Sequence, residues 1–280
     1  MGSFLGHTLS GSLFLLLGFL WSIKHPLRFF SLKSKYAVRV EKYIDYMELL
    51  EWGGMIVFCF IGFLLEQFLP EGPHFHLYNK ENHKWVLLNI WQHATMHIMF
   101  MFAGIAGVLV RCKFQVPLGM DYFLFSLALF IEGLLFYTHT DRLSSLDQYI
   151  HYIGIIPIWC GALCSLFEVW LRNNPILEQI RTSMFITQGT WMWQIGFVLY
   201  PRWGDPHWDH NDPATRMFMA MSYSWHFVGV TLFLAIMYGI VYWIFRRQKV
   251  SLGYTEMEIL EFSNENTKTY TFLVDGSNDK

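Results

Sequence analysis

Long apolar runs recur along the chain and are separated by short polar segments. Seven of these runs extend for about 20 residues, the length that an α-helix needs to cross about 30 Å of hydrocarbon. They fall near residues 5–23, 50–69, 86–110, 118–138, 149–171, 181–200 and 215–245. In lipid only helices or closed barrels satisfy the backbone, and these runs lack the alternation of barrel strands. We therefore predict an all-α, polytopic membrane protein built as a bundle of seven transmembrane helices.

Lysine and arginine concentrate in alternate connecting segments. Basic residues follow the first, third and seventh runs and flank the link between the fifth and the sixth, whereas the opposite segments hold few. Cytosolic loops carry such an excess of Lys and Arg. We predict a lumenal or extracellular N-terminus and a cytosolic C-terminus. The chain then divides into a membrane domain, residues 1–246, and a polar, disordered cytosolic tail, residues 247–280.

The composition supports a membrane setting. Hydrophobic residues make up 54% of the chain and charged residues 15%, whereas soluble domains are about one quarter charged. The net charge of -2 and the lack of a basic tract with interleaved aromatics exclude a nucleic-acid partner. The expected partners are the lipid bilayer, a lipid-like small molecule and further copies of the chain.

The candidate chemistry lies in the histidines. Under the predicted topology, only His25 of the twelve histidines falls on the cytosolic side. Ionisable groups within a membrane span are costly and usually face the bundle interior, so they are functional candidates. Imidazoles from several helices together with a carboxylate suit Zn²⁺ or a similar divalent metal. We predict four metal ligands and Glu132 as a further ligand or the catalytic base; the four are His93, His139, His151 and His226.

Other polar residues lie at the same depth. His97 follows His93 by four residues and therefore shares its helix face. Gln188 and Gln194 belong to the sixth run, and Glu66 to the end of the second. We expect these four side chains to surround the metal or to replace one of its ligands. We expect His7, at the start of the first run, to be an interfacial residue.

Three functions fit this pattern. A metal with an open coordination position activates water, which suits a metal-dependent hydrolase of a lipid-like substrate. Alternatively, the protein is a non-enzymatic trafficking or scaffold protein whose polar cluster is structural. A proton or ion carrier is the third possibility, and the lack of internal repeats disfavours it.

Several motifs resemble the transmembrane protein 45 family. They include GHTLSGSLFLLLGFLWSIKHPLRFF, LLEQFLPEGPHFHLY, WQHATMH, FIEGLLFYTH, LEQIRTSMFITQGTWMWQIGFVLYP and SWHF. The resemblance implies seven membrane helices and a place on Golgi, endosomal or plasma membranes, in epithelial cells, without an established activity. His97 departs from the family pattern, which has Tyr there, and this shifts the weight of the predicted metal site to His93.

Overall fold

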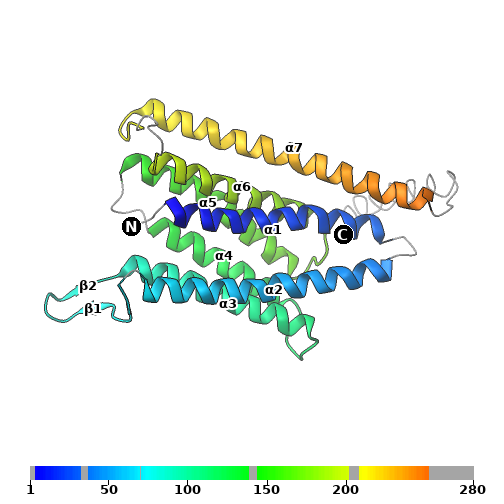
Figure 1. Cartoon of the computed structure of the whole chain (residues 1–280), viewed down its shortest axis with the longest axis horizontal. Helices are drawn as coiled ribbons and strands as arrows, with labels where there is room; N and C mark the ends of the chain where they lie inside the picture. Colours follow the sequence, from blue (N-terminus) through cyan, green and yellow to red (C-terminus); the bar gives the residue numbers. More distant parts are fainter. Residues whose placement is uncertain (1–3, 33–36, 70, 139–143, 202–207, 252–280) are drawn as a thin grey trace, which may run out of the picture.

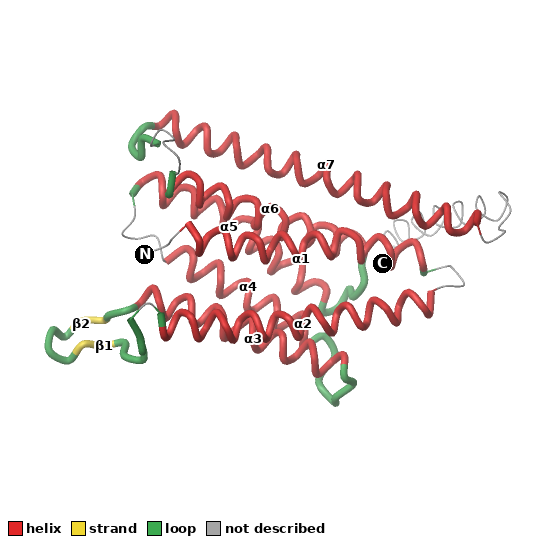
Figure 2. The backbone as a smooth tube through the Cα atoms, viewed as in Figure 1, coloured by secondary structure: helices red, strands yellow, loops and turns green. Residues whose placement is uncertain are grey.

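The computed structural model describes residues 4–32, 37–69, 71–138, 144–201 and 208–251. Within these residues the chain forms seven α-helices and one short antiparallel hairpin (Figure 1, Figure 2). The elements are α1 (Phe4–Ser31), α2 (Ala37–Phe68), β1 (Tyr78–Asn79), β2 (Lys84–Trp85), α3 (Leu88–Arg111), α4 (Met120–Thr138), α5 (Ser145–Glu168), α6 (Pro175–Leu199) and α7 (Pro213–Ser251). The predicted all-helical architecture with seven helices is confirmed for this part of the chain.

Six of these helices are long and apolar enough to cross a membrane, namely α1, α2, α3, α4, α5 and α7. The exception is α6, which carries Glu178, Arg181 and Gln188. These side chains are buried, because α6 lies against α1, α5 and α7. A helix that its neighbours cover does not need a lipid-compatible surface. The chain is thus an integral multi-pass membrane protein, while the crossing of α6 and the orientation of the termini stay predictions.

Two helices extend well beyond the apolar runs that predict them. The first continues to Ser31, and the second begins already at Ala37. Lys24 and Arg28, predicted to lie in a connecting loop, are therefore helical, and both side chains are buried. Helix α7 also continues past residue 246 to Ser251, and the rest of the predicted tail lies outside the described residues.

Small residues allow close approach within two helix pairs. The most extensive helix contact joins α1 and α6. Here a Cβ on either Gly11 or Gly189 would lie 2.8 Å from the backbone oxygen of the other, so only glycine fits. In the second pair, a Cβ at Gly107 of α3 would overlap the Trp52 indole of α2.

Aromatic side chains fill the centre of the bundle. The ring of Phe185 in α6 lies 4.6 Å from Trp21 of α1 and 5.7 Å from Phe125 of α4, measured between ring centroids. The outer helix faces expose large apolar side chains such as Val57 and Leu232. An exposed apolar surface of this kind is suited to lipid.

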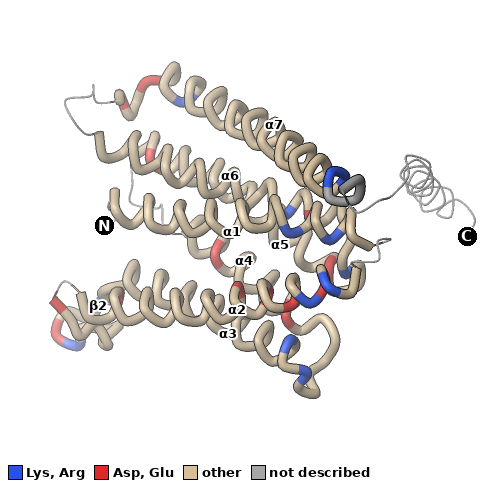
Figure 3. Tube along the Cα trace, turned by 45° about the vertical axis from the view of Figure 1, so that its right-hand side comes forward, with Lys and Arg blue, Asp and Glu red and all other residues tan. Residues whose placement is uncertain are grey.

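Charged residues gather at the end of the bundle where α1 ends and α2 begins (Figure 3). The buried Glu48 carboxylate of α2 accepts a hydrogen bond from Arg28 Nη2 at 2.7 Å and forms an ion pair with Arg111 Nη2 at 2.5 Å. Lys24 Nζ lies 3.7 Å from Glu48 and donates to Glu51 Oε2 at 2.6 Å. One carboxylate, that of Glu48, thus joins α1, α2 and α3.

The same network reaches α5 and α6. Arg28 Nη1 donates to the buried Glu178 of α6 at 3.1 Å. Arg181 of α6 makes two hydrogen bonds, of 2.6 and 3.2 Å, to the buried Glu168 carboxylate of α5. Its guanidinium also lies 4.2 Å from the Trp21 ring centroid. We call these ion pairs, which lie on five helices, the charged network.

Replacing Glu48 by Gln tests the charged network. Removing one partner of a buried ion pair leaves uncompensated charge, so Glu48→Gln should lower the free energy of unfolding by about 3–5 kcal/mol. Asp45→Asn is the matched control, because Asp45 also faces Arg111, at 3.3 Å, but its side chain is 56% exposed. Asp45→Asn should lower the free energy of unfolding by less than about 1 kcal/mol. Thermal or denaturant unfolding in detergent micelles measures the stability of both variants. Equally small losses in the two would contradict a stabilising role of the buried ion pairs.

Candidate functional site

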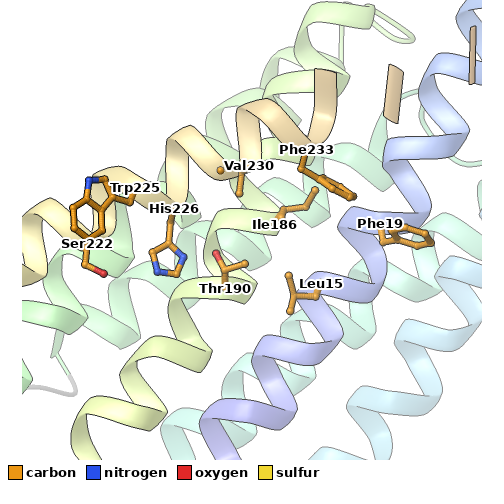
Figure 4. A pocket seen from close by; sticks show the side chains of 10 residues that line it. Leu15, Phe19, Ile186, Thr190, Ser222, Trp225, His226, Val230 and Phe233 are labelled. Carbon is orange, nitrogen blue, oxygen red and sulfur yellow. The ribbon is translucent and has the colours of Figure 1, made fainter. Parts of the chain in front are cut away.

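A pocket of about 580 Å³ opens between α1, α6 and α7 (Figure 4). We call it the lateral pocket, because it lies along the side of the bundle and α1 and α7 are both candidate membrane spans. Its lining residues are Leu15, Phe19, Ile186, Thr190, Ser222, Trp225, His226, Gly229, Val230 and Phe233.

The packing of α7 leaves this space open. Towards one end of α7, Met219 and Tyr223 pack into a cluster with residues of α5 and α6. Towards the other end, Val241 and Phe245 pack on Phe30 of α1. Between these contacts lies Gly229, where a Cβ would meet nothing within 4 Å. The missing side chain at this position therefore contributes to the pocket.

The lateral pocket is mainly apolar and has four hydrogen-bonding side chains. Thr190, Ser222 and His226 supply two hydroxyl groups and an imidazole, and Trp225 supplies an indole N–H. The His226 imidazole projects from α7 towards α6, where Thr190 lies (Figure 4). Its ring also packs edge-on against Trp191, with 5.4 Å between ring centroids. At the rim, Phe19 and Trp225 are exposed, so the pocket opens to the region that lipid occupies.

His93 and His97 share one face of α3, as their spacing predicts, and this face meets α2. His93 Nδ1 lies 3.1 Å from Glu66 Oε1. His97 lies one turn further along α3, where its ring fills the space above Gly62 and packs edge-on against Phe58. The structure thus brings together three of the predicted site residues, His93, His97 and Glu66, between α2 and α3.

His151 has a different set of neighbours. Its Nδ1 lies 2.9 Å from the Asp147 carboxylate, and its Nε2 lies 3.5 Å from Nε2 of His7 in α1. Phe136 packs on the His151 ring, and Tyr200 on the His7 ring. Burial raises the pKa of Tyr200, and the negative charge of Asp147 adds to this effect. His7 is buried among these groups, and its expected place at the membrane interface stays a prediction.

The remaining predicted residues are spread over other positions. Glu132 of α4 is buried, and its Oε2 atom has no hydrogen-bond partner among the described residues. The side-chain amide of Gln188 is likewise buried without a partner in this part of the chain, and Gln194 is half-buried. His139 lies outside the described residues.

The described residues contain no group of three or more His, Cys, Asp or Glu side chains that is arranged to hold a metal ion. The partners of His93, His151 and His226 lie on different helices. A zinc centre that joins them with His139 and Glu132 therefore stays a prediction.

Two features were missed at the sequence level, the lateral pocket and the charged network. The charged network had a signal, because the basic residues Lys24 and Arg28 precede one connecting segment and the acidic residues Glu48 and Glu51 follow it. The pocket had none, since Gly229 lies in an apolar run that reads as an ordinary span.

Glu132 gives a test of the unpartnered polar groups. A buried carboxyl oxygen without a hydrogen-bond partner lowers the free energy of unfolding by about 1–3 kcal/mol, because it loses its hydration and gains no bond in return. Glu132→Met, which keeps the length of the side chain, should therefore raise the free energy of unfolding by a similar amount, and thermal unfolding in detergent measures it. A lower stability would contradict this account, because it would show that the carboxyl group has a partner.

The chain is similar over part of its length to three curated proteins. It is 28% identical over 152 residues to transmembrane epididymal protein 1 of Rattus norvegicus, which covers 54% of this chain and 50% of that protein. It is 26% identical over 151 residues to transmembrane epididymal protein 1 of Homo sapiens, an alignment that covers 53% of this chain and 55% of that protein. It is 24% identical over 152 residues to transmembrane epididymal protein 1A of Mus musculus, with 54% of this chain and 50% of that protein covered. The chain thus spans about half the length of the curated relatives it matches.

A family model matches the second half of the membrane region. It covers residues 118–239, which contain α4, α5, α6 and most of α7. This stretch includes Glu132, His151 and the α6 and α7 walls of the lateral pocket. Residues 118–239 therefore match DUF716, a family of unknown function.

Proposed function

We propose that this multi-pass membrane protein binds an uncharged, lipid-like small molecule in the lateral pocket. The observation that carries the proposal is an apolar pocket of about 580 Å³ between candidate membrane spans, with a few hydrogen-bonding groups inside. Ligand pockets usually measure about 300–1,000 Å³ and combine an apolar lining with few polar groups.

The lining defines the chemistry of the ligand. Leu15, Ile186 and Phe233 suit a hydrocarbon or fused-ring body. Thr190, Ser222 and His226 suit one hydroxyl or carbonyl group. None of the lining residues is Lys, Arg, Asp or Glu, so the head group should carry no charge. A sterol or a diacylglycerol has this chemistry.

The lateral pocket supports binding better than hydrolysis. A catalytic zinc site uses three protein ligands and a water molecule. Among the lining residues, His226 is the only one of the predicted metal ligands. We therefore propose a role in holding or presenting the lipid-like molecule. We place this role on membranes of the secretory and endosomal system, which is the location that the resemblance to the transmembrane protein 45 family implies.

Filling the lateral pocket tests the proposal. The purified protein in nanodiscs is titrated with fluorescent sterol and fluorescent diacylglycerol. Gly229→Leu should weaken the binding of the true ligand class at least tenfold, because the added side chain takes up ligand space without a clash in the empty protein.

Gly239→Leu is the matched control. It lies on the same helix, also has nothing within 4 Å of its Cβ position, and does not line the lateral pocket. This variant should bind the ligand like wild type. If both variants bind equally well, or if the wild type binds neither ligand, the proposal is wrong.

His226→Phe examines the polar contact separately. It keeps an aromatic ring but removes the hydrogen-bonding nitrogens, and a net hydrogen bond contributes about 0.5–1.5 kcal/mol. The affinity for the hydroxyl-bearing ligand should fall about 2- to 10-fold. An analogue that lacks the hydroxyl should bind both proteins alike, and an equal loss for the two ligands would exclude a hydrogen bond from His226.

A further inference from the structure

Two buried imidazoles face each other where α1 and α5 begin. The Nε2 atoms of His7 and His151 lie 3.5 Å apart, and the ring planes meet at 69°. His7 is 9% exposed and His151 is 4% exposed. The two residues are 144 positions apart in the sequence, so the fold, and not local spacing, makes this pair.

Asp147 fixes the protonation pattern of His151. Its carboxylate oxygen Oδ1 lies 2.9 Å from His151 Nδ1, and its backbone oxygen lies 2.8 Å from the same nitrogen. The hydrogen bond runs to the backbone oxygen, so Nδ1 carries the proton and donates it, and the carboxylate charge beside Nδ1 favours the same tautomer. The lone pair of the neutral ring is then on Nε2, which points at His7. Metal-binding histidines commonly donate their other ring N–H to a backbone carbonyl or a carboxylate.

The distance between the two nitrogens suits a shared metal ion. Hydrogen bonds from N–H groups are about 2.7–3.2 Å long, so 3.5 Å is long for a direct bond. Two nitrogens on one tetrahedral Zn²⁺, each at about 2.0–2.1 Å, lie about 3.3–3.4 Å apart. The imidazoles therefore need to move very little to bind one ion.

We propose that His7 and His151 bind one divalent transition-metal ion of the zinc type through their Nε2 atoms, with Asp147 as the positioning residue. Phe136 and Tyr200 flank the two rings and limit the access of bulk solvent. This pair differs from the ligand set predicted from the sequence, in which His151 was grouped with His93, His139 and His226. It is also independent of the proposed lipid-like ligand.

Metal titration tests the pair. The full-length protein is purified without a polyhistidine tag, stripped of metal with a chelator and titrated in detergent with Co²⁺, whose visible spectrum reports tetrahedral coordination, and then with Zn²⁺. The wild type should bind one equivalent. His7→Gln and His151→Gln should each weaken binding at least tenfold. Asp147→Asn should weaken it by a smaller factor, because it removes the negative charge beside Nδ1 but keeps the backbone oxygen to which Nδ1 donates.

His93→Gln and His76→Gln are the controls, one for a predicted ligand between α2 and α3 and one for an exposed histidine, and both should bind like wild type. Gly229→Leu should also leave metal binding unchanged, so failure of the lipid proposal and failure of this one are separable. Substoichiometric binding by the wild type overturns the proposal. So does unchanged affinity in His7→Gln and Asp147→Asn, which decide the matter if His151→Gln does not fold.

Discussion

The pairing of buried charges at one end of the bundle is the constraint on which the other features depend. In a low-dielectric interior each of these groups is costly alone, so Arg28, Glu48 and Arg181 require their partners on neighbouring helices. The pairs therefore fix how far each helix is rotated about its own axis. Because helices are stiff, that rotation also sets what α1 presents further along, Leu15 to the lateral pocket and His7 to His151.

The helices themselves follow from the sequence, because apolar runs of about 20 residues have few alternatives in lipid. Their ends do not. Lys24 and Arg28 read as loop residues as long as their partners are unknown, and a hydropathy profile carries no information about partners. Only when Glu48 lies opposite does it become favourable for α1 to remain helical as far as Ser31. Tertiary ion pairs thus decide a boundary that local composition places several residues too early.

At the candidate site, too, the sequence predicts only part of the arrangement, because it indicates which residues share a helix face but not which helices lie side by side. Helical spacing correctly predicted the common face of His93 and His97, and both meet α2. It could not give which helices are adjacent. That α1 lies against α6, with its first turns beside α5, depends on the close approach at Gly11 and Gly189 and on the order of packing around it. His151 was therefore identified as a candidate, whereas its partner His7 was not.

The burial of α6 has a consequence for the topology of the whole chain. Hydropathy alone selects an even number of spans, six, which would return both termini to the same side of the membrane. If α6 also crosses, the number is odd and the C-terminal tail emerges on the side opposite the N-terminus. Whether α6 crosses the membrane therefore decides on which side of it the C-terminal tail lies. Its polar residues are tolerated because α1, α5 and α7 cover them.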